Sequence, residues 1–199
     1  MRGLEQIPWL YDAAQAVSEA LGFRRWRLWL VRGAQGRTLE VGCGTGRNLP
    51  LYAADVTLVA VDPSPEALAA ARKRAPAAML VRASAEALPF RDASFDCVIS
   101  SLVFCSVPDP AKGLAEVRRT LKREGALRMV EHVRSTGSFG AWLQDFIQPA
   151  WTAVAGGCHP NRDTERNVIQ AGFQIDPGSL RIRGNMRRFF ARKRQGAES

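Results

Sequence analysis

The sequence contains few histidines and no closely spaced pair of cysteines. Among its 199 residues only His132 and His159 are histidines, and neither stands in a spacing typical of metal ligands. The four cysteines form no Cys-x-x-Cys pair and are spread along the chain at Cys43, Cys97, Cys105 and Cys158. We therefore predict reduced thiols in a cytoplasmic protein and no metal site.

Long apolar runs and a targeting signal are also absent. No stretch of about eighteen apolar residues occurs, so the sequence predicts no membrane-spanning helix. The opening MRGLEQIPWL lacks the basic and then apolar order of a secretion signal. A chain of 199 residues is long enough for one domain with a core of its own.

Lysine is scarce as well, yet the chain is strongly basic. Its net charge is +9, and arginine supplies 24 of the 28 basic residues. Charge runs of this kind usually form a solvated surface or tail. The alternative interpretation is peripheral contact with a membrane of acidic lipids, or with nucleic acid. The basic residues near the two ends are Arg24, Arg25, Arg27, Arg32, Arg181, Arg183, Arg187, Arg188, Arg192, Lys193 and Arg194.

The most informative stretch is a glycine-rich segment. Residues 38–41 are mainly apolar and predict a buried strand. Gly42, Gly44 and Gly46 follow at alternate positions, and Arg47 opens a segment that can begin a helix. Glycines allow a tight turn and a close approach of the backbone to a ligand. The N–H groups of such a loop favour polar or anionic ligand groups.

The spacing around this loop indicates which ligand it binds. The pattern is G-x-G-x-G after Glu40, whereas the dinucleotide fingerprint is G-x-G-x-x-G. A second strand, predicted over residues 56–61, ends at Asp62, which is 20 positions after Gly42. An acid at that strand tip accepts hydrogen bonds from ribose hydroxyls. Strand, loop, helix, strand and acid in this order therefore favour a nucleoside ligand.

These two segments, LEVGCGTGRNL and VAVDPSPEAL, resemble motifs I and II of class I S-adenosylmethionine (SAM)-dependent methyltransferases. The resemblance implies an α/β fold: a Rossmann-like, doubly wound, mostly parallel seven-stranded sheet with an N-terminal helical lid. It implies a single methyltransferase domain over residues 1–199, with a helical cap at 1–36, the core at 37–194 and a tail at 195–199. The alternative is a Rossmann-like domain that binds another nucleotide.

The same resemblance implies that SAM, the cofactor, binds across the carboxyl ends of the first, second and fourth strands. Glu40 would orient the methionine end, the glycine loop would lie beneath SAM, and Asp62 would bind the ribose. ASAEALPF resembles the adenine-binding segment of the family, with Ser84 where Asp is usual. This contact is weaker, because a hydroxyl accepts less strongly than a carboxylate. The implied cofactor residues are Glu40, Gly42, Cys43, Gly44, Gly46, Asp62, Pro63, Ser84, Ala85, Glu86, Ser100 and Ser101.

Periodicity and turn residues predict the remaining elements. Helices are expected from the glycine loop to about residue 54, from near Glu66 to residue 75, and over 111–121, 139–154 and 164–171. Strands are expected over 79–82, 95–100, 126–130, 173–175 and 188–191, the last two antiparallel. KREGAL, residues 122–127, is expected to turn. A basic apolar helix over residues 23–31 is expected either to lie on a membrane or to pack on the domain.

The segment after the fourth strand restricts the methyl acceptor. Neither D/N-P-P-Y/W nor a Pro-Cys pair occurs there. The first is expected for methylation of planar amino groups, and the second for chemistry at cytosine C5. Their absence argues against a nucleic-acid substrate and favours a small-molecule acceptor.

Further segments resemble the thiol S-methyltransferases of animals and their bacterial relatives. They are LVFCSV at 102–107, EHV at 131–133, Q-D-x-I-x-P-A-W at 144–151 and GC-x-x-x-R-D-T at 157–164. The resemblance to quinone and phosphatidylethanolamine methyltransferases is looser. Thiol methylation is therefore the leading hypothesis. The alternatives are C-, N- or O-methylation of a quinone, lipid or natural product, a nucleic-acid-binding methyltransferase, and a SAM-binding protein without catalysis.

The acceptor side has one candidate catalytic residue. His132 directly follows the fifth strand, at the carboxyl edge of the sheet, and is the candidate general base. A structural histidine is the alternative. Arg162 and Asp163 are expected to pin their loop by an ion pair, and lining the acceptor pocket together with His159 is the alternative. The candidate acceptor contacts are Tyr11, with a lid role, and Cys105, Trp142, Phe146 and His159; for the aromatic residues core packing is the alternative.

Overall fold

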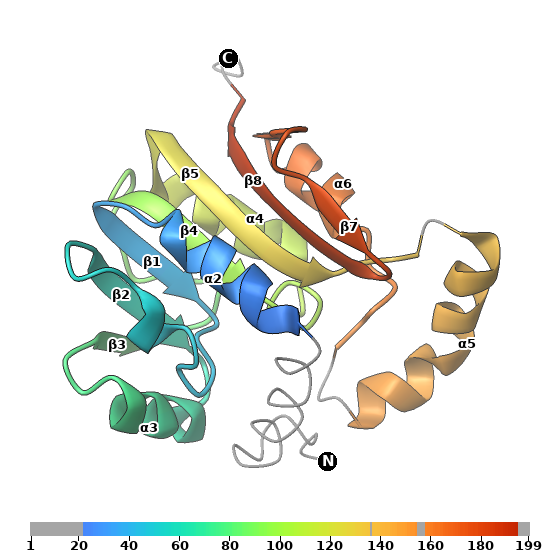
Figure 1. The fold of residues 1–199 in the computed structure, drawn as a ribbon, viewed down its shortest axis with the longest axis horizontal. Helices are drawn as coiled ribbons and strands as arrows, with labels where there is room; N and C mark the ends of the chain where they lie inside the picture. Colours follow the sequence, from blue (N-terminus) through green and yellow to red (C-terminus); the bar gives the residue numbers. More distant parts are fainter. Residues whose placement is uncertain (1–21, 136, 155–157, 195–199) are drawn as a thin grey trace.

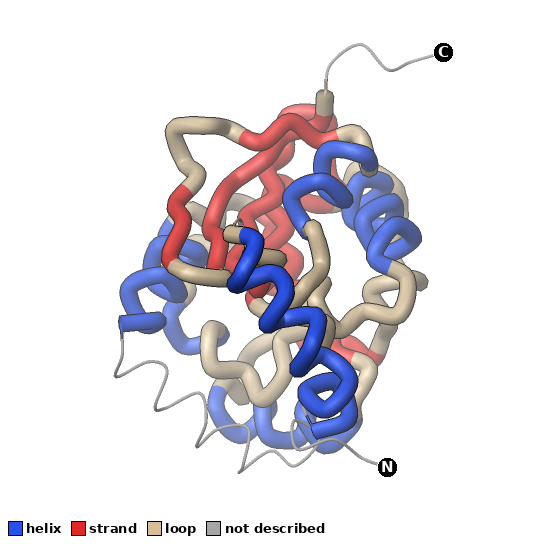
Figure 2. Tube along the Cα trace, turned by 90° about the vertical axis from the view of Figure 1, so that its right-hand side faces the viewer, coloured by secondary structure: helices blue, strands red, loops and turns tan. Residues whose placement is uncertain are grey.

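The computed structural model describes residues 22–135, 137–154 and 158–194 (Figure 1). The predicted lid residue Tyr11, most of the predicted helical cap and the tail at 195–199 lie outside these residues. One sheet runs through the molecule, and helices lie on both sides of it (Figures 1 and 2).

The sheet has eight strands in the described part of the chain, in the order β3-β2-β1-β4-β5-β8-β6, with β7 also paired to β8. The first five strands in this order, β3, β2, β1, β4 and β5, are parallel to one another. Strand β8 is antiparallel to β5, β6 and β7. The order reverses between β1 and β4, and doubly wound sheets bind ligands at such a switch point. The strands are β1 (Arg37–Val41), β2 (Thr57–Asp62), β3 (Met79–Arg82), β4 (Phe95–Ser101), β5 (Leu121–His132), β6 (Phe173–Ile175), β7 (Arg181–Arg183) and β8 (Met186–Lys193).

Both faces of the central strands are covered, as buried parallel strands require. One face carries Leu39, Val98 and Leu127 and packs with α4 (Pro110–Thr120) and α6 (Thr164–Gln170). The other carries Cys97 and Ile99 and packs with α2 (Arg24–Arg32), which lies in front of the sheet in Figure 1. The predicted α/β, mostly parallel architecture is confirmed.

Side-chain caps start three of the helices. Ser64 accepts from the N–H of Ala67 at the start of α3 (Pro65–Arg74), and Asp109 and Asp163 cap α4 and α6 in the same way. A longer helix, α5 (Ser138–Val154), stands apart from the sheet at the right of Figure 1. Among the helices of the described residues, none has the length and apolar character of a transmembrane span.

The strand count is eight in the described residues, one more than predicted. The additional strand is β7, whose three residues are all exposed and pair with one edge of β8. It was missed because a strand without a buried face shows no alternation of apolar and polar residues.

The glycine loop leads into a single turn of 3₁₀-helix, η3 (Leu49–Leu51), and the helix predicted to about residue 54 is wrong. Tyr52 already has extended backbone, with φ −70° and ψ 147°. Its hydroxyl donates to the buried carboxylate of Glu40 at 2.8 Å. We attribute the difference to this tertiary hydrogen bond, which outweighs a weak local helix preference.

The turn predicted at KREGAL is also wrong, since β5 continues through it. Pairing with β4 shifts register between Phe95 and Cys97, opposite this stretch. A Cβ on Gly125 would lie 2.8 Å from Leu121 and 3.0 Å from the carbonyl oxygen of Asp96. The glycine therefore accommodates an irregularity within a long strand.

Of the two interpretations of the basic apolar helix, the structure supports packing on the domain. Leu30 and Val31 of α2 are buried, and Leu30 contacts the core cluster that contains Ile99 and Val130. Arg128 on β5 donates to the carbonyl oxygens of this helix.

Leu127 tests the packing of the sheet. It is fully buried on β5, between β4 and β8. Leu127→Ala is expected to lower the free energy of unfolding by about 2–5 kcal/mol, because it leaves a cavity. The control Ile182→Ala, on exposed β7, is expected to change it by less than about 0.5 kcal/mol. Chemical denaturation measures both, and equal small losses would contradict this position for Leu127.

Candidate functional site

A loop with three glycines leaves the carboxyl end of β1. Gly42, Gly44 and Gly46 have φ values of 65°, 53° and 81°, which residues with side chains rarely adopt. A Cβ on Gly42 would lie 2.5 Å from Val103 Cγ2, and one on Gly46 would lie 2.8 Å from Ala71 Cα. A Cβ on Gly44 would meet no described atom within 4 Å. The loop is therefore closed by protein at two glycines and open at the third.

Asp62, at the end of β2, fixes this loop from the neighbouring strand. Its carboxylate accepts from the backbone N–H of Gly44 at 2.8 Å and of Ser64 at 2.9 Å. Burial raises the pKa of Asp62, and these two N–H groups oppose the rise. Pro63, the next residue, is exposed. The acid thus stands directly beside the open glycine.

Glu40 is the centre of a buried polar network beneath the loop. One carboxylate oxygen accepts from Asn48 Nδ2 at 2.6 Å, and the other accepts from the Tyr52 hydroxyl at 2.8 Å. Asn48 in turn accepts from Arg27 Nη1 at 2.6 Å. Burial raises the pKa of Glu40 to about 7, although the two hydrogen bonds and the charge of Arg27 oppose the rise. A neutral and an ionised Glu40 are therefore similar in free energy near neutral pH.

A pocket opens between this network and the end of β4. Four of the predicted cofactor residues line it: Glu40, Gly42, Cys43 and Ser101. Its other lining residues were not predicted, and they are Arg27, Thr45, Arg47, Asn48 and Leu102. Leu102 has φ 59°, a strained conformation for a leucine that is typical of functional loops. The position of Arg47 and Asn48 directly after the glycines was the one signal in the sequence that pointed to them.

No feature of the sequence indicated that Arg27 lines this pocket. Its place among basic residues near the N-terminus led to the prediction of a solvated charge, which is wrong for this residue and for Arg187. Arg27 is buried because α2 packs on the sheet, and Arg187 is 2% exposed and pairs with Glu165 at 2.8 Å. The charge of each is balanced inside the fold.

The predicted adenine-side residues form one turn after β3. The Ser84 hydroxyl lies 3.2 Å from both the Glu86 backbone N–H and a Glu86 carboxylate oxygen. The other oxygen of Glu86 accepts from the N–H of Asp109 at 2.7 Å, and Ala85 is buried. This turn is joined to the second strand, since the N–H of Ala83 donates to the carbonyl oxygen of Asp62. Ser84, Ala85 and Glu86 therefore lie together next to the predicted ribose ligand.

Ser100 differs from its predicted position. It is fully buried, and its hydroxyl donates to Glu131 Oε1 at 2.8 Å. The same oxygen accepts from the N–H of Val103 at 3.0 Å and of Phe104 at 3.3 Å. Burial raises the pKa of Glu131. Ser100 thus supports the loop after β4, and its neighbour Ser101 faces the pocket.

The structure brings His132 together with two cysteines. One ligand-type atom of each of Cys105, His132 and Cys158 lies within 4.8 Å of the other two. Both cysteines are buried. The hydrogen bond from Cys158, together with burial, raises the pKa of the Cys105 thiol well above its usual range. No local spacing in the sequence pointed to this cluster.

The loop before α6 supports the cluster through backbone contacts. The N–H of His159 donates to the carbonyl oxygen of Cys105 at 2.8 Å, and its ring Nδ1 lies 2.9 Å from Gln148 Nε2. Burial and the charge of Arg162 lower the pKa of His159. Arg162 Nη1 donates to the carbonyl oxygens of Phe104 and Val107. Arg162 thus pins the loop as predicted, but through carbonyl groups, while Asp163 caps α6.

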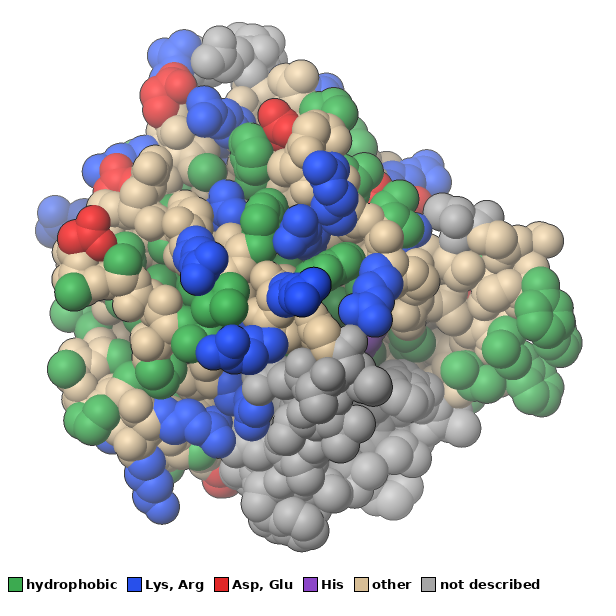
Figure 3. Space-filling view, in the orientation of Figure 1, with side chains coloured by type: hydrophobic (Ala, Val, Ile, Leu, Met, Phe, Trp, Pro, Cys, Tyr) green, Lys and Arg blue, Asp and Glu red, His purple; other side chains and the backbone are tan. Residues whose placement is uncertain are grey.

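Phe139, Trp142 and Phe146 of α5 have exposed side chains. Trp142 is 58% exposed and Phe146 is 72% exposed, and their rings stack at 5.7 Å. They form the hydrophobic group at the right of Figure 3. Their place in an acceptor site stays a prediction, and core packing is wrong for both residues. The reason is that α5 stands apart from the sheet.

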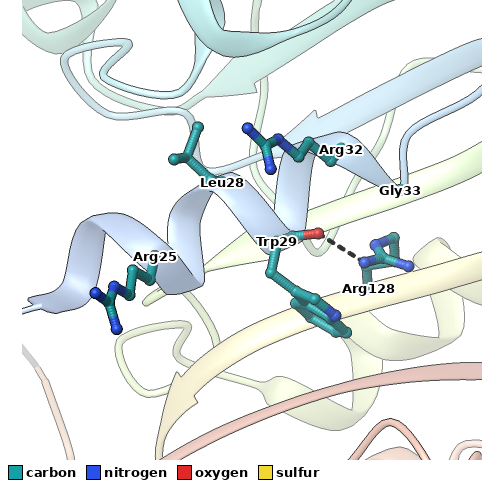
Figure 4. Close-up of a pocket in the computed structure, with 6 residues that line it drawn as sticks. All are labelled: Arg25, Leu28, Trp29, Arg32, Gly33 and Arg128. Carbon is teal, nitrogen blue, oxygen red and sulfur yellow. Dashed lines mark hydrogen bonds between the residues drawn. The ribbon is translucent and has the colours of Figure 1, made fainter.

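Basic residues from both ends of the sequence gather on one face, in the middle of Figure 3. Arg188 lies 4.9 Å and Arg128 lies 4.2 Å from the ring of Trp29. A second pocket beside this tryptophan is lined by Arg25, Leu28, Trp29, Arg32, Gly33 and Arg128 (Figure 4). Arg128 donates to the carbonyl oxygen of Trp29 there at 2.7 Å. Several of these arginines therefore support the packing of α2 on the sheet.

Comparison with known proteins identifies the family of this chain. Residues 39–129 match the family model described as a methyltransferase domain. A thiol S-methyltransferase, TMT1B of Rattus norvegicus, is 35% identical over 143 residues, which are 68% of this chain and 59% of the relative. A demethylmenaquinone methyltransferase of Renibacterium salmoninarum is 35% identical over 158 residues, 76% of this chain and 66% of the relative. The chain spans about three fifths of the length of the thiol methyltransferases it matches.

Solved structures share the fold. The crystal structure of a putative methyltransferase from Bacillus halodurans superposes with a TM-score of 0.71 at 18% identity, covering 85% of this chain and 98% of that one. Identity this low supports the architecture alone, and the sequence relatives support the family. The chain therefore belongs to the class I SAM-dependent methyltransferases, whose methyl donor is S-adenosylmethionine.

Proposed function

We propose that this protein transfers the methyl group of SAM to the sulfur of a small-molecule thiol. The main support is the identity of 35% with a thiol S-methyltransferase over 68% of the chain. That similarity extends over 143 residues, whereas the family match covers residues 39–129.

On the cofactor side, we assign roles from the position of each group. SAM would lie over Gly44, the open glycine, with its ribose held by Asp62 and its adenine beside Ser84, Ala85 and Glu86. The methionine end lies in the pocket lined by Glu40, where a carboxylate attracts the ammonium group. Hydrogen bonds from backbone and side chains hold these groups in place before SAM binds.

The reaction is an in-line displacement. The acceptor sulfur attacks the methyl carbon, the bond from that carbon to the sulfonium sulfur breaks, and its electron pair stays on S-adenosylhomocysteine. The acceptor loses its thiol proton to solvent and becomes a thioether. Alignment of the two sulfur atoms with the methyl group can contribute about 7–11 kcal/mol. A thiol with a pKa of about 8.5 already supplies some thiolate at neutral pH, so the proposal does not require a general base.

Methylation of a quinone is the second candidate. It is supported by the identity of 35% with the demethylmenaquinone methyltransferase, which covers 76% of the chain. Methylation of a ring carbon has one chemical requirement that methylation of a thiol lacks. A ring hydroxyl must lose its proton before the carbon becomes nucleophilic.

An acceptor panel separates these two functions. SAM is incubated with the protein and with small thiols, their hydroxyl and amine analogues, and a naphthoquinol. We expect release of S-adenosylhomocysteine with the thiols, at a rate at least about 100-fold above the hydroxyl analogues, since thiolate is available near neutral pH. Turnover confined to the naphthoquinol would replace the thiol proposal with the quinone one.

Asp62→Asn tests the ribose role. The amide accepts at one position only and carries no charge, so SAM affinity is expected to fall about 10–100-fold. Asp55→Asn, in an exposed loop, is the control and is expected to bind SAM like the wild type. Calorimetric titration measures both. Equal affinity of the two variants would refute the assignment of Asp62.

Glu40 predicts a pH dependence of SAM binding. Its pKa of about 7 lies above the ordinary value, so the ligand-free protein holds a neutral Glu40 below about pH 7 and a carboxylate above it. Since the ammonium of SAM favours the carboxylate, SAM affinity is expected to rise about 10-fold from pH 6 to pH 8, with release of one proton.

Glu40→Gln provides the comparison for this pH dependence. It keeps a polar side chain of similar size but cannot ionise, so SAM affinity is expected to be weaker and nearly constant over the same range. A wild-type affinity that is constant between pH 6 and pH 8 contradicts the prediction, and so does an equal rise in the variant.

A further inference from the structure

Three side chains with metal-binding atoms meet at the carboxyl edge of the sheet. Cys105 lies in the loop after β4, His132 ends β5 and Cys158 precedes α6. Their ligand-type atoms lie within 4.8 Å of one another, and both cysteines are buried. Two thiols and an imidazole are the ligand set that zinc takes in sites with three protein ligands. The cluster therefore has the composition of a metal site, although the sequence spacing argues against one.

The three backbones are tied to one another, so the cluster is built on fixed supports. The N–H of His159, next to Cys158, donates to the carbonyl oxygen of Cys105 at 2.8 Å. Arg162 donates to the carbonyl oxygens of Phe104 and Val107, on either side of that cysteine. Support of this kind, from the shell around the ligands, is what metal sites need to hold their geometry.

The segment that carries His132 belongs to the same framework. Glu131, its neighbour on β5, accepts from the N–H groups of Val103 and Phe104, which lead to Cys105. After the strand, the N–H of Arg134 donates to the carbonyl oxygen of Arg162 at 2.9 Å. Each of the three segments is thus bonded to at least one of the others close to its ligand residue.

The distances between the three ligand atoms and the charge of the two thiolates suit a zinc ion. With Zn–S bonds of about 2.3 Å in a tetrahedron, two sulfur ligands stand about 3.8 Å apart. Ligand atoms within 4.8 Å therefore need to approach by about 1 Å or less, which small side-chain rotations provide. Two thiolates neutralise Zn²⁺, so the occupied site adds no net charge to buried surroundings. Thiolate and imidazole together favour zinc over hard cations such as magnesium.

We propose that Cys105, His132 and Cys158 bind a Zn²⁺ ion and leave a fourth coordination position open. The role of His132 is then that of a metal ligand instead of a general base. Because zinc prefers thiolate ligands, the fourth position takes a thiol. The site resembles a catalytic zinc centre in its ligand count, since closed structural sites have four protein ligands.

A thiol at this fourth position would be the methyl acceptor, a step that rests on the proposed function. Coordination releases the thiol proton to solvent, and the bound sulfur then attacks the SAM methyl carbon. Val103, two residues before Cys105, covers Gly42, so the cluster and the glycine loop share one side of the sheet edge. The thioether product is a weaker ligand than a thiolate, and its departure leaves the zinc coordinated by the three protein ligands.

The experiment measures zinc binding without SAM or acceptor. The full chain is purified under reducing conditions, stripped with a chelator and titrated with Zn²⁺ alone. We expect one tightly held zinc per wild-type chain, and its loss in Cys105→Ala and in Cys158→Ala. Cys97→Ala is the matched control, because Cys97 is equally buried but lies on β4 outside the cluster. Absence of stoichiometric zinc in the wild type overturns the proposal, as does full zinc binding in the Cys105→Ala, Cys158→Ala double variant.

Titration with SAM shows whether the cysteine variants are folded. If they are not, cobalt binding to the wild type tests the metal site instead. Co²⁺ added to the stripped wild type is expected to give the intense visible bands of a tetrahedral site and a thiolate-to-cobalt charge-transfer band. The weak spectrum of octahedral cobalt, without charge transfer, overturns the proposal.

Thiol turnover by the stripped and the zinc-loaded wild type separates the metal site from the reaction. A rise of at least about 10-fold on loading supports the acceptor position. Equal turnover overturns that position but leaves zinc binding and thiol methylation in place. Zinc binding without turnover of any thiol overturns the proposed function, while the metal site stands.

Discussion

The loops of this site depend on a buried carboxylate at the end of β5. Glu131 is fully buried and collects hydrogen bonds from the Ser100 hydroxyl and from the N–H groups of Val103 and Phe104. An unpaired carboxylate at this depth would be costly, so the loop after β4 has to adopt the conformation that supplies these donors. That conformation brings Val103 over Gly42 and leads the chain to Cys105.

The same principle shapes the other half of the site. Glu40 and Asp62 are buried acids near the ends of β1 and β2, and both are satisfied by groups of the glycine loop region. Asp62 binds the N–H of Gly44, and Glu40 binds Asn48, just beyond the glycines. Three of the parallel strands, β2, β1 and β5, therefore each present an acid that organises the loop beside it. The cost of burying these acids is offset by fixed backbone and side-chain donors, which hold the site ready for a ligand.

The surface outside the site divides into two chemically different regions. Arginines from α2, β5 and β8 gather on the face in front of the sheet (Figure 3). Two of them, Arg128 and Arg188, lie over tryptophan rings of α2. On α5, by contrast, the aromatic rings of Phe139, Trp142 and Phe146 follow one another on an exposed surface. Both groups of residues were visible in the sequence, but their surroundings were not. Burial of an arginine or exposure of a tryptophan depends on which element packs over it.

Local sequence patterns predicted a large part of the secondary structure of this protein. The glycine loop, Asp62 at the end of β2, the helices α3, α4 and α6, and most of the strands follow from patterns within a few residues. Such patterns are readable because turn geometry, capping and side-chain alternation act between near neighbours. They led to the family and to the acids and glycines of the cofactor side.

Only the tertiary structure decided the rest. Arg27 reaches Asn48 because α2 packs on the sheet, and Tyr52 leaves its expected helix to bind Glu40. Cys105, His132 and Cys158 meet because parallel strands end at one edge and a later loop returns to it. These contacts join residues far apart in the chain, so no local pattern carries them. For Arg27 and Tyr52 the physical origin is the cost of leaving a buried polar group without a partner once the sheet has closed over it.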